Sequence, residues 1–232
     1  FPAHTRDARY LDRLKAAYPI HPEVFDRLYE DWASLENFQR TRGVLRLMAM
    51  VVHRLWSDGN PDWMILPGSL PLYDTQVRNE MLRFLPQGWE PVMERDVDGA
   101  RSIPTEIDEM NPGLGSLQAA RRVARSIFLG SAPASTGPRI RGINAEYVRL
   151  GCAQPGQPAG KYDDALRHLA DQLHYLYSVN DRYWYDTQTN LRREAESRMS
   201  RFHRDEHLIP ELRDRLKSLI KGGPFTGVHV FT

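Results

Sequence analysis

The sequence predicts a mainly α-helical protein, in which a helical bundle precedes a winged-helix-like domain with a small β-hairpin. Three observations predict this fold class. Apolar residues recur at helical spacing in most segments, glycine and proline stand between these segments, and aromatic residues flank an Asn-Asp pair near residue 180 as in a hairpin. With 232 residues, the chain is long enough for one large or two small domains.

The first predicted domain, residues 1–60, begins with two short helices. The first helix covers residues 7–18 and is interrupted by Pro19. Pro22 suits the first turn of the second helix, because proline lacks an amide hydrogen that this turn would leave unpaired. The second helix then presents an apolar stripe at helical spacing, formed by Val24, Phe25, Leu28, Tyr29 and Trp32.

The third helix of this bundle covers residues 41–56 and ends at an Asp-Gly-Asn-Pro turn. It is apolar almost all round, which predicts that it is buried. Arg40, Arg42 and Arg46 stand at its start, where packing does not require them. Guanidinium groups at a rigid helix start suit a phosphate or carboxylate partner. By spacing alone, the other interpretation is ion pairing with the nearby acids Glu30, Asp31 and Glu36.

Residues 61–115 are predicted to form an irregular connector or an insertion. Within it, residues 63–66 have the composition of a short strand and residues 74–85 have the pattern of a helix. Residues 86–115 contain many prolines and glycines and show little periodicity. The segment Asn-Pro-Gly-Leu-Gly-Ser at 111–116 opens a helix, but it lacks the lysine and the preceding strand of a phosphate-binding loop.

The predicted winged-helix-like domain, residues 116–189, consists of three helices followed by a hairpin. Asn180 and Asp181 stand between two strand-like aromatic runs and predict the hairpin turn. Loops with glycine and proline separate the helices, which cover residues 117–129, 144–150 and 163–176. Trailing helices over 190–202 and 209–219 and the start of a further segment complete the last predicted region, 190–232.

The third helix of a helix-turn-helix fold is the one that reads DNA. Here its exposed face carries three acids, which would repel a phosphate backbone: Asp163, Asp164 and Asp171. The candidate contacts with nucleic acid or a protein partner are Arg182 in the wing and Arg192 with Arg193 after it. A further basic cluster consists of Arg121, Arg122 and Arg125. Protein contact or weak backbone contact is the preferred interpretation.

The composition excludes several classes of protein. The 31 Lys and Arg residues nearly balance the 30 Asp and Glu residues, so there is no global bias toward nucleic acid or an anionic membrane. Cys152 is the only cysteine, which excludes an internal disulfide and favours a cytoplasmic location. No apolar run is long enough to span a bilayer and no signal peptide is present, so no membrane partner is expected.

Two further sequence patterns bear on catalysis. No G-x-x-x-x-G-K-[ST] sequence occurs, so the chain alone is not expected to be an enzyme. His203 and His207 match H-x-x-E-H, an inverted zinc-peptidase pattern, but Pro210 follows closely and no third ligand is evident. A solvated helix end is the preferred interpretation, and no metal site is predicted. Because the chain begins at Phe1 and ends on a strand-like run, we expect a fragment of a longer protein.

Five strings are long enough to carry a family resemblance, and together they extend over nearly the whole chain. They are YPIHPEVFDRLYEDW at 18–32, FQRTRGVLRLMA at 38–49, ARRVARSIFLGS at 120–131, LGCAQPG at 150–156 and DRYWYDTQTNLRR at 181–193. These strings resemble large prokaryotic AAA+-type ATPases of unknown function, a family often found beside DNA methyltransferase and phage-defence genes. The resemblance is to the lid and the winged-helix-like region of those proteins.

The resemblance implies that residues 1–60 form a lid over a bound nucleotide. In such lids a sensor arginine in a Gly-x-x-Arg sequence reaches the γ-phosphate, and residues 43–46 have this pattern. The resemblance therefore implies that Arg46 is the first candidate for the sensor arginine and Arg42 the second. Arg40 is a further candidate for nucleotide binding. The family's phosphate-binding loop and magnesium-binding acid would lie upstream of Phe1, so ATP and Mg²⁺ are expected only in the full-length protein.

Together these expectations describe a regulatory fragment of a larger ATPase. It would couple nucleotide state to a protein or nucleic-acid partner without hydrolysing ATP alone. Its main expected partner is the upstream ATPase core of the same polypeptide, with DNA or other defence-system proteins as further partners. Two alternatives stay open, a winged-helix DNA-binding or regulatory module and a protein-interaction scaffold.

Overall fold

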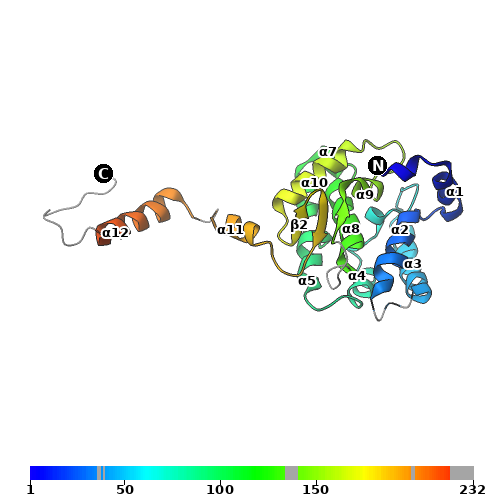
Figure 1. The fold of residues 1–232 in the computed structure, drawn as a ribbon, viewed down its shortest axis with the longest axis horizontal. Coiled ribbons are helices and arrows are strands. Elements are labelled where there is room, and N and C mark those ends of the chain that lie inside the picture. Colours follow the sequence, from blue (N-terminus) through cyan, green and yellow to red (C-terminus); the bar gives the residue numbers. More distant parts are fainter. Residues whose placement is uncertain (36–37, 39, 134–140, 200–201, 220–232) are drawn as a thin grey trace. The chain divides into compact units, whose positions relative to one another are not determined.

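The chain is mainly helical and carries a small three-stranded antiparallel sheet, which confirms the predicted fold class at this level (Figure 1). The computed structural model describes residues 1–35, 38, 40–133, 141–199 and 202–219. It divides into two compact units, Phe1–Asn190 and Leu191–Thr232. The finer division of the first unit at residues 60 and 115 stays a prediction. None of the described helices is long and apolar enough to cross a membrane.

Short helices linked by tight turns form the N-terminal segment. Pro22 is the first residue of its helix, as predicted, and the buried Trp32 indole donates a 2.8 Å hydrogen bond to the Leu129 carbonyl. This bond joins the segment to a distant central helix. The elements are a 3-10 turn at Ala3–Arg6, α1 at Ala8–Ala17, α2 at Pro22–Asp26, a π-helical turn at Arg27–Asp31 and a 3-10 turn at Trp32–Ser34.

Helix α3 (Arg40–Ser57) follows, close to its predicted range, but only one of its faces is buried. The inner face contributes Val44, Leu47, Val51 and Leu55 to the core. Its outer face carries large apolar side chains that are exposed. The expectation that the whole helix is buried is therefore wrong, because no described element of the first unit covers its second side.

The middle of the chain is helical rather than irregular. Its helices are buried through residues such as Trp89, Met93 and Ile107. The predicted helix at 74–85 is present over residues 75–82. The helices between residues 86 and 115 were not predicted, because each is at most eight residues long and begins or ends near proline or glycine, so no apolar period can develop. The predicted strand at 63–66 is a single parallel bridge between Ile65 and Ile20. The helices are α4 at Thr75–Leu82, α5 at Trp89–Val92 with a π-helical turn at Met93–Val97, α6 at Ile103–Met110 and α7 at Pro112–Gly115.

The last part of the first unit contains the sheet. Asn180 and Asp181 have φ angles of 48° and 60°, the left-handed conformation of a two-residue hairpin turn, so the predicted hairpin is confirmed. A third strand, β1, pairs with β3 and was not predicted, because two residues are too short to show alternation. The elements are α8 at Ala119–Ser131, β1 at Ile143–Asn144, α9 at Ala145–Leu150, α10 at Gly160–Gln172, β2 at Leu176–Val179 and β3 at Arg182–Tyr185.

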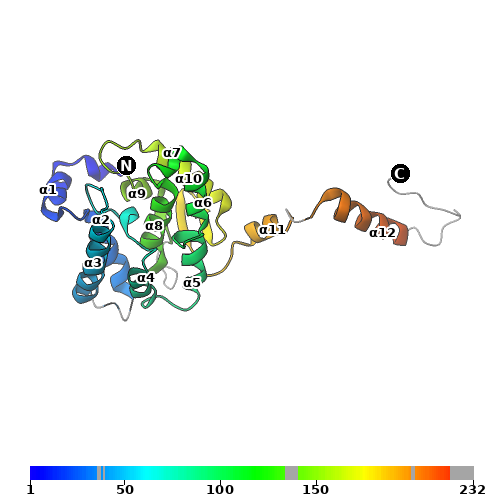
Figure 2. The same ribbon diagram turned by 180° about the vertical axis from the view of Figure 1, so that it is seen from behind.

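Helix α8 is the centre of the first unit, and Figures 1 and 2 show α3 and α4 on one side of it and α10 with the sheet on the other. Every residue of α8 except Arg121 is buried. A side chain at Gly130 would force its surroundings to shift, since its Cβ would lie 2.4 Å from Cγ2 of Ile143. The helix thus joins the N-terminal helices and the sheet into one hydrophobic core.

The second unit contains two described helices, close to their predicted ranges. Helix α11 covers Leu191–Met199, and α12 covers Ile209–Leu219 after a π-helical turn at Arg204–Leu208. Several of its apolar side chains are exposed, among them Leu212 and Leu219. In the described part of this unit, no residue of α12 is buried.

Candidate functional site

The first turns of α3 hold the predicted nucleotide-binding arginines. Arg46 is 54% exposed, and its Nη2 lies 3.2 Å from Oε2 of Glu80 on α4. The side chain of Arg42 is exposed and forms no ion pair or hydrogen bond with any residue that the structure describes. Arg40 is the first residue of the helix, but its side chain lies outside the described part.

Glu80 is the acid that sequence reasoning missed. Its carboxylate is almost fully buried and is shared between Arg46 and Arg83, with the Arg83 Nη1 3.8 Å away. The predicted partner Asp31 pairs with Arg27 instead, at 3.1 Å. Glu80 could not be found by helical spacing, because only the packing of α4 against α3 brings it near. Since Arg46 is half exposed, its ion pair contributes less than about 1 kcal/mol and leaves the guanidinium free to exchange partners.

The outer face of α3 continues from these arginines as a line of apolar side chains. An open surface rather than an enclosed cavity follows this line, and it is bordered by residues of this one helix: Leu45, Met48, Ala49, Val52, His53 and Trp56. The sequence predicts that the helix is buried, yet all of these residues except Met48 are exposed. Their exposure depends on which elements pack against α3, and periodicity cannot show this for a helix that is apolar on both sides.

The predicted basic cluster on α8 is mainly internal. Arg125 donates two 2.8 Å hydrogen bonds to the carboxylate of Asp98, and both side chains are buried. Arg122 donates to Asp62 at 2.5 Å and is also buried. These two arginines cannot serve as surface phosphate contacts; they fasten α8 to the segments that precede it. They were misjudged because a basic triplet on a helix is usually solvated.

The other predicted contact residues are engaged in local bonds or lie outside the description. Arg182 donates to the carbonyl oxygens of Arg141 and Gly142 and to Oδ1 of Asn144, so its guanidinium holds the loop before β1. Arg193 pairs with Glu196 at 2.5 Å within α11. The side chain of Arg192 lies outside the described residues.

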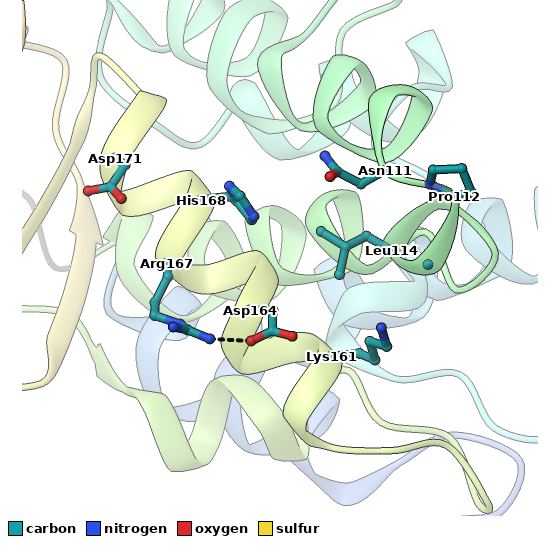
Figure 3. Close-up of a pocket in the computed structure, with 9 residues that line it drawn as sticks. Asn111, Pro112, Leu114, Lys161, Asp164, Arg167, His168 and Asp171 are labelled. Atoms are coloured by element: carbon teal, nitrogen blue, oxygen red, sulfur yellow. Dashed lines mark hydrogen bonds and ion pairs between the residues drawn. The ribbon is translucent and has the colours of Figure 1, made fainter.

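A hollow of about 470 Å³ lies between α7 and the exposed face of α10 (Figure 3). Asn111 and His168 approach it from opposite sides, and Arg167 is paired with Asp164. Both signs of charge therefore line it, so it has no preference for an anion such as phosphate. Its lining consists of Asn111, Pro112, Gly113, Leu114, Lys161, Asp164, Arg167, His168 and Asp171.

The H-x-x-E-H sequence has a local structural role. Nδ1 of His207 accepts a 3.2 Å hydrogen bond from the His203 amide, and the two rings stack with centroids 6.1 Å apart. A ring nitrogen that accepts from the backbone is not free to bind a metal. Across the described ranges, no group of three His, Cys, Asp or Glu side chains is placed to hold a metal ion.

Residues 5–142, which contain the helices from α1 to α8, match the family described as the DUF499 second domain. No curated protein matches the chain. No solved structure matches it either. Because the family match covers more than half of the sequence, the chain belongs to the DUF499 second domain family.

Proposed function

We propose that this chain is the lid and regulatory part of a larger AAA+-like ATPase, and that it couples the state of a bound nucleotide to a partner. ATP and Mg²⁺ would be held by an upstream core of the same polypeptide. The chain itself would contribute Arg46, and secondarily Arg42, to the phosphates. The observation that carries the proposal is the placement of two accessible guanidinium groups on the first turns of an 18-residue helix.

The physical basis is the charge that develops on a transferred phosphoryl group. A guanidinium that reaches its oxygens stabilises the transition state and makes hydrolysis depend on lid position. Arg46 is suited to this role because its only described acid, Glu80, also has Arg83 nearby. When Arg46 turns toward a nucleotide, Glu80 keeps a positive neighbour, so the exchange leaves no buried carboxylate without compensation.

The test compares Arg46→Ala with Arg83→Ala in the full-length protein. Both changes remove one arginine from Glu80, and both side chains are more than half exposed, at 54% and 60%. We expect Arg46→Ala to lower ATP turnover at least 10-fold and Arg83→Ala to change it less than twofold, with unfolding midpoints within experimental error of each other. Unchanged turnover in Arg46→Ala sinks the sensor role.

A winged-helix contact module is the second candidate, and the order of elements favours it. Helix α8, strand β1, helices α9 and α10 and the β2–β3 hairpin follow in the winged-helix order, with strands arranged β1-β3-β2. The face of α10 carries both charge signs, and Arg182 is occupied by carbonyl groups, so a protein partner suits this module better than DNA.

Titration with duplex DNA over a range of salt concentrations separates these two partners. We expect no binding in the micromolar range at 50 mM salt. Binding that weakens steeply with salt would instead establish a DNA-contacting wing. If nucleotide has no effect on any property of the full-length protein, the chain is a protein-interaction scaffold and the lid proposal fails.

A further inference from the structure

The outer ridge of α3 consists of Leu45, Ala49, Val52 and Trp56. These residues are spaced four, three and four apart, so they form one straight line along the helix. Trp56 is 87% exposed, Leu45 65% and Val52 45%, and Ala49 is also exposed. The opposite face of the same helix is buried in the core, so the ridge is held on a rigid support.

An exposed line of this kind differs from scattered surface apolar residues. Single exposed apolar side chains are common and have no functional meaning. A contiguous apolar patch on a rigid element marks an interaction site, and Trp together with Arg is the composition found at the energetic centres of interfaces.

The charge beside the ridge restricts what covers it. Helix α3 contains four arginines and one histidine and no acid. At its C-terminal end, Arg54 is neutralised by Asp58 and Asp74. At its N-terminal end, Arg42 has no ion pair with a described residue, and Arg46 is half exposed beside Leu45. A complementary surface is therefore apolar along most of its length and negatively charged where Arg42 meets it.

We infer that the outer ridge of α3 is the docking surface for the neighbouring domain of the same polypeptide, and that this domain presents an apolar groove with negative charge at the arginine end. The family to which residues 5–142 belong is a second domain, so its members have a further domain within the same chain. The inference rests on the proposed function, because the negative charge opposite Arg42 and Arg46 would include the phosphates of the bound nucleotide.

Cysteine accessibility tests the docking surface. Cys152 is the only cysteine of this chain, and complete burial raises the pKa of its thiol to about 12, so it does not react with maleimide under native conditions. Ala49→Cys places a reactive thiol in the middle of the ridge. Glu90→Cys places one on the exposed side of α5, away from α3 in both views of the fold (Figures 1 and 2).

The rate of maleimide labelling is measured by mass spectrometry of the modified peptide, in the 232-residue chain and in the full-length protein. We expect the Ala49→Cys rate to fall at least 10-fold in the full-length protein and the Glu90→Cys rate to change less than twofold. Adding Trp56→Asp to the full-length Ala49→Cys protein is expected to restore the rate. Circular dichroism verifies that each variant is folded.

Three results would overturn the inference: equal Ala49→Cys rates in both proteins, protection that grows with the concentration of the 232-residue chain, and protection that requires anionic phospholipid vesicles. The second result would indicate another copy of the chain, and the third a membrane surface. Arg46→Ala separates this inference from the proposed function. If Ala49→Cys is protected in the full-length protein and Arg46→Ala leaves ATP turnover unchanged, the docking surface is supported and the sensor role is removed. If Ala49→Cys is not protected and Arg46→Ala lowers ATP turnover, the sensor role is supported and the docking surface is removed.

Discussion

His21 joins α1 to α2 through two hydrogen bonds, and one of them requires its neutral imidazole. Its Nδ1 accepts from the Glu23 amide at 3.2 Å, so the ring hydrogen lies on Nε2, which is 3.2 Å from the Tyr10 hydroxyl. Burial, and to a lesser degree Arg13, lower the pKa of His21 from 6.5 to about 4. Protonation would remove the cap of α2 and place a charge in the interior.

The direction of this pKa shift predicts acid sensitivity. Because the folded-state pKa lies below the unfolded-state value, the contribution of His21 is present above about pH 6.5 and is lost as the pH falls toward about 4. Between pH 7 and pH 5 the loss is about 2 kcal/mol. We expect His21→Asn, which keeps a capping oxygen but does not titrate, to lose about 2 kcal/mol less than the wild type over this interval. Urea unfolding at both pH values measures this; equal losses would contradict it.

The sequence shows which residues belong to the candidate site, but it does not show which residues their side chains pair with. The arginines at the start of α3 stand out because that helix is otherwise apolar and contains no acid. Their acid, Glu80, belongs to α4, and the pairs that occupy Arg122 and Arg125 join residues 60 and 27 positions apart. Spacing rules describe neighbours along one helix, so pairs of this kind are found only by folding the chain.

At the scale of elements, the approach of α8 to β1 depends on the absence of a side chain at Gly130. A Cβ there would lie 2.4 Å from Cγ2 of Ile143, which is far inside van der Waals contact. By contrast, Gly160 at the start of α10 has nothing within 4 Å of the corresponding position. Two helical glycines in one domain therefore have opposite packing environments.

These environments predict opposite effects of the same substitution. Gly130→Ala is expected to lower the free energy of unfolding by about 1–3 kcal/mol, because it overpacks the contact between α8 and β1. Gly160→Ala is expected to be neutral or to raise it by up to about 1 kcal/mol, because alanine loses less backbone entropy on folding. Denaturant unfolding of both variants provides the comparison, and a Gly130→Ala protein as stable as wild type would refute the packing argument.

The elements that were predicted correctly are those whose structure depends on one helix face or one turn. The helices at 7–18, 41–56 and 209–219 and the Asn180-Asp181 hairpin depend on local periodicity and turn chemistry. The helices between residues 86 and 115 leave no pattern in the sequence, because each is short and lies near proline or glycine, so no apolar period develops. The exposed ridge of α3 is hidden for another reason: that helix is apolar on both sides, so periodicity does not tell the covered face from the uncovered one.

At the scale of the whole first unit, the buried ion pair of Arg125 and Asp98 joins α8 to the residue that follows the π-helical turn at Met93–Val97. Both side chains are almost completely buried, and both guanidinium–carboxylate hydrogen bonds are 2.8 Å long. Removal of either partner would leave an uncompensated charge in the core. The pair of Arg13 and Asp26 has a similar length, 2.8 Å, but is exposed to solvent.

Burial thus predicts different costs for two pairs of equal length. We expect Arg125→Met to lower the free energy of unfolding by about 3–5 kcal/mol, and Arg13→Met to lower it by less than about 1 kcal/mol. The double variant Arg125→Met, Asp98→Leu is expected to recover part of the loss, because it removes the uncompensated carboxylate. Chemical unfolding measures all three, and equal costs for the two single variants would contradict the assignment.

The sequence by itself determined the helical class, the hairpin and the concentration of arginine at the start of α3, since each depends on residues within one or two turns of chain. Tertiary structure alone decided which arginines are internal, which acid pairs with Arg46 and which face of α3 stays uncovered. The reason is that burial and ion pairing depend on which elements pack together. That choice follows from contacts between residues far apart in the chain, which no local pattern records.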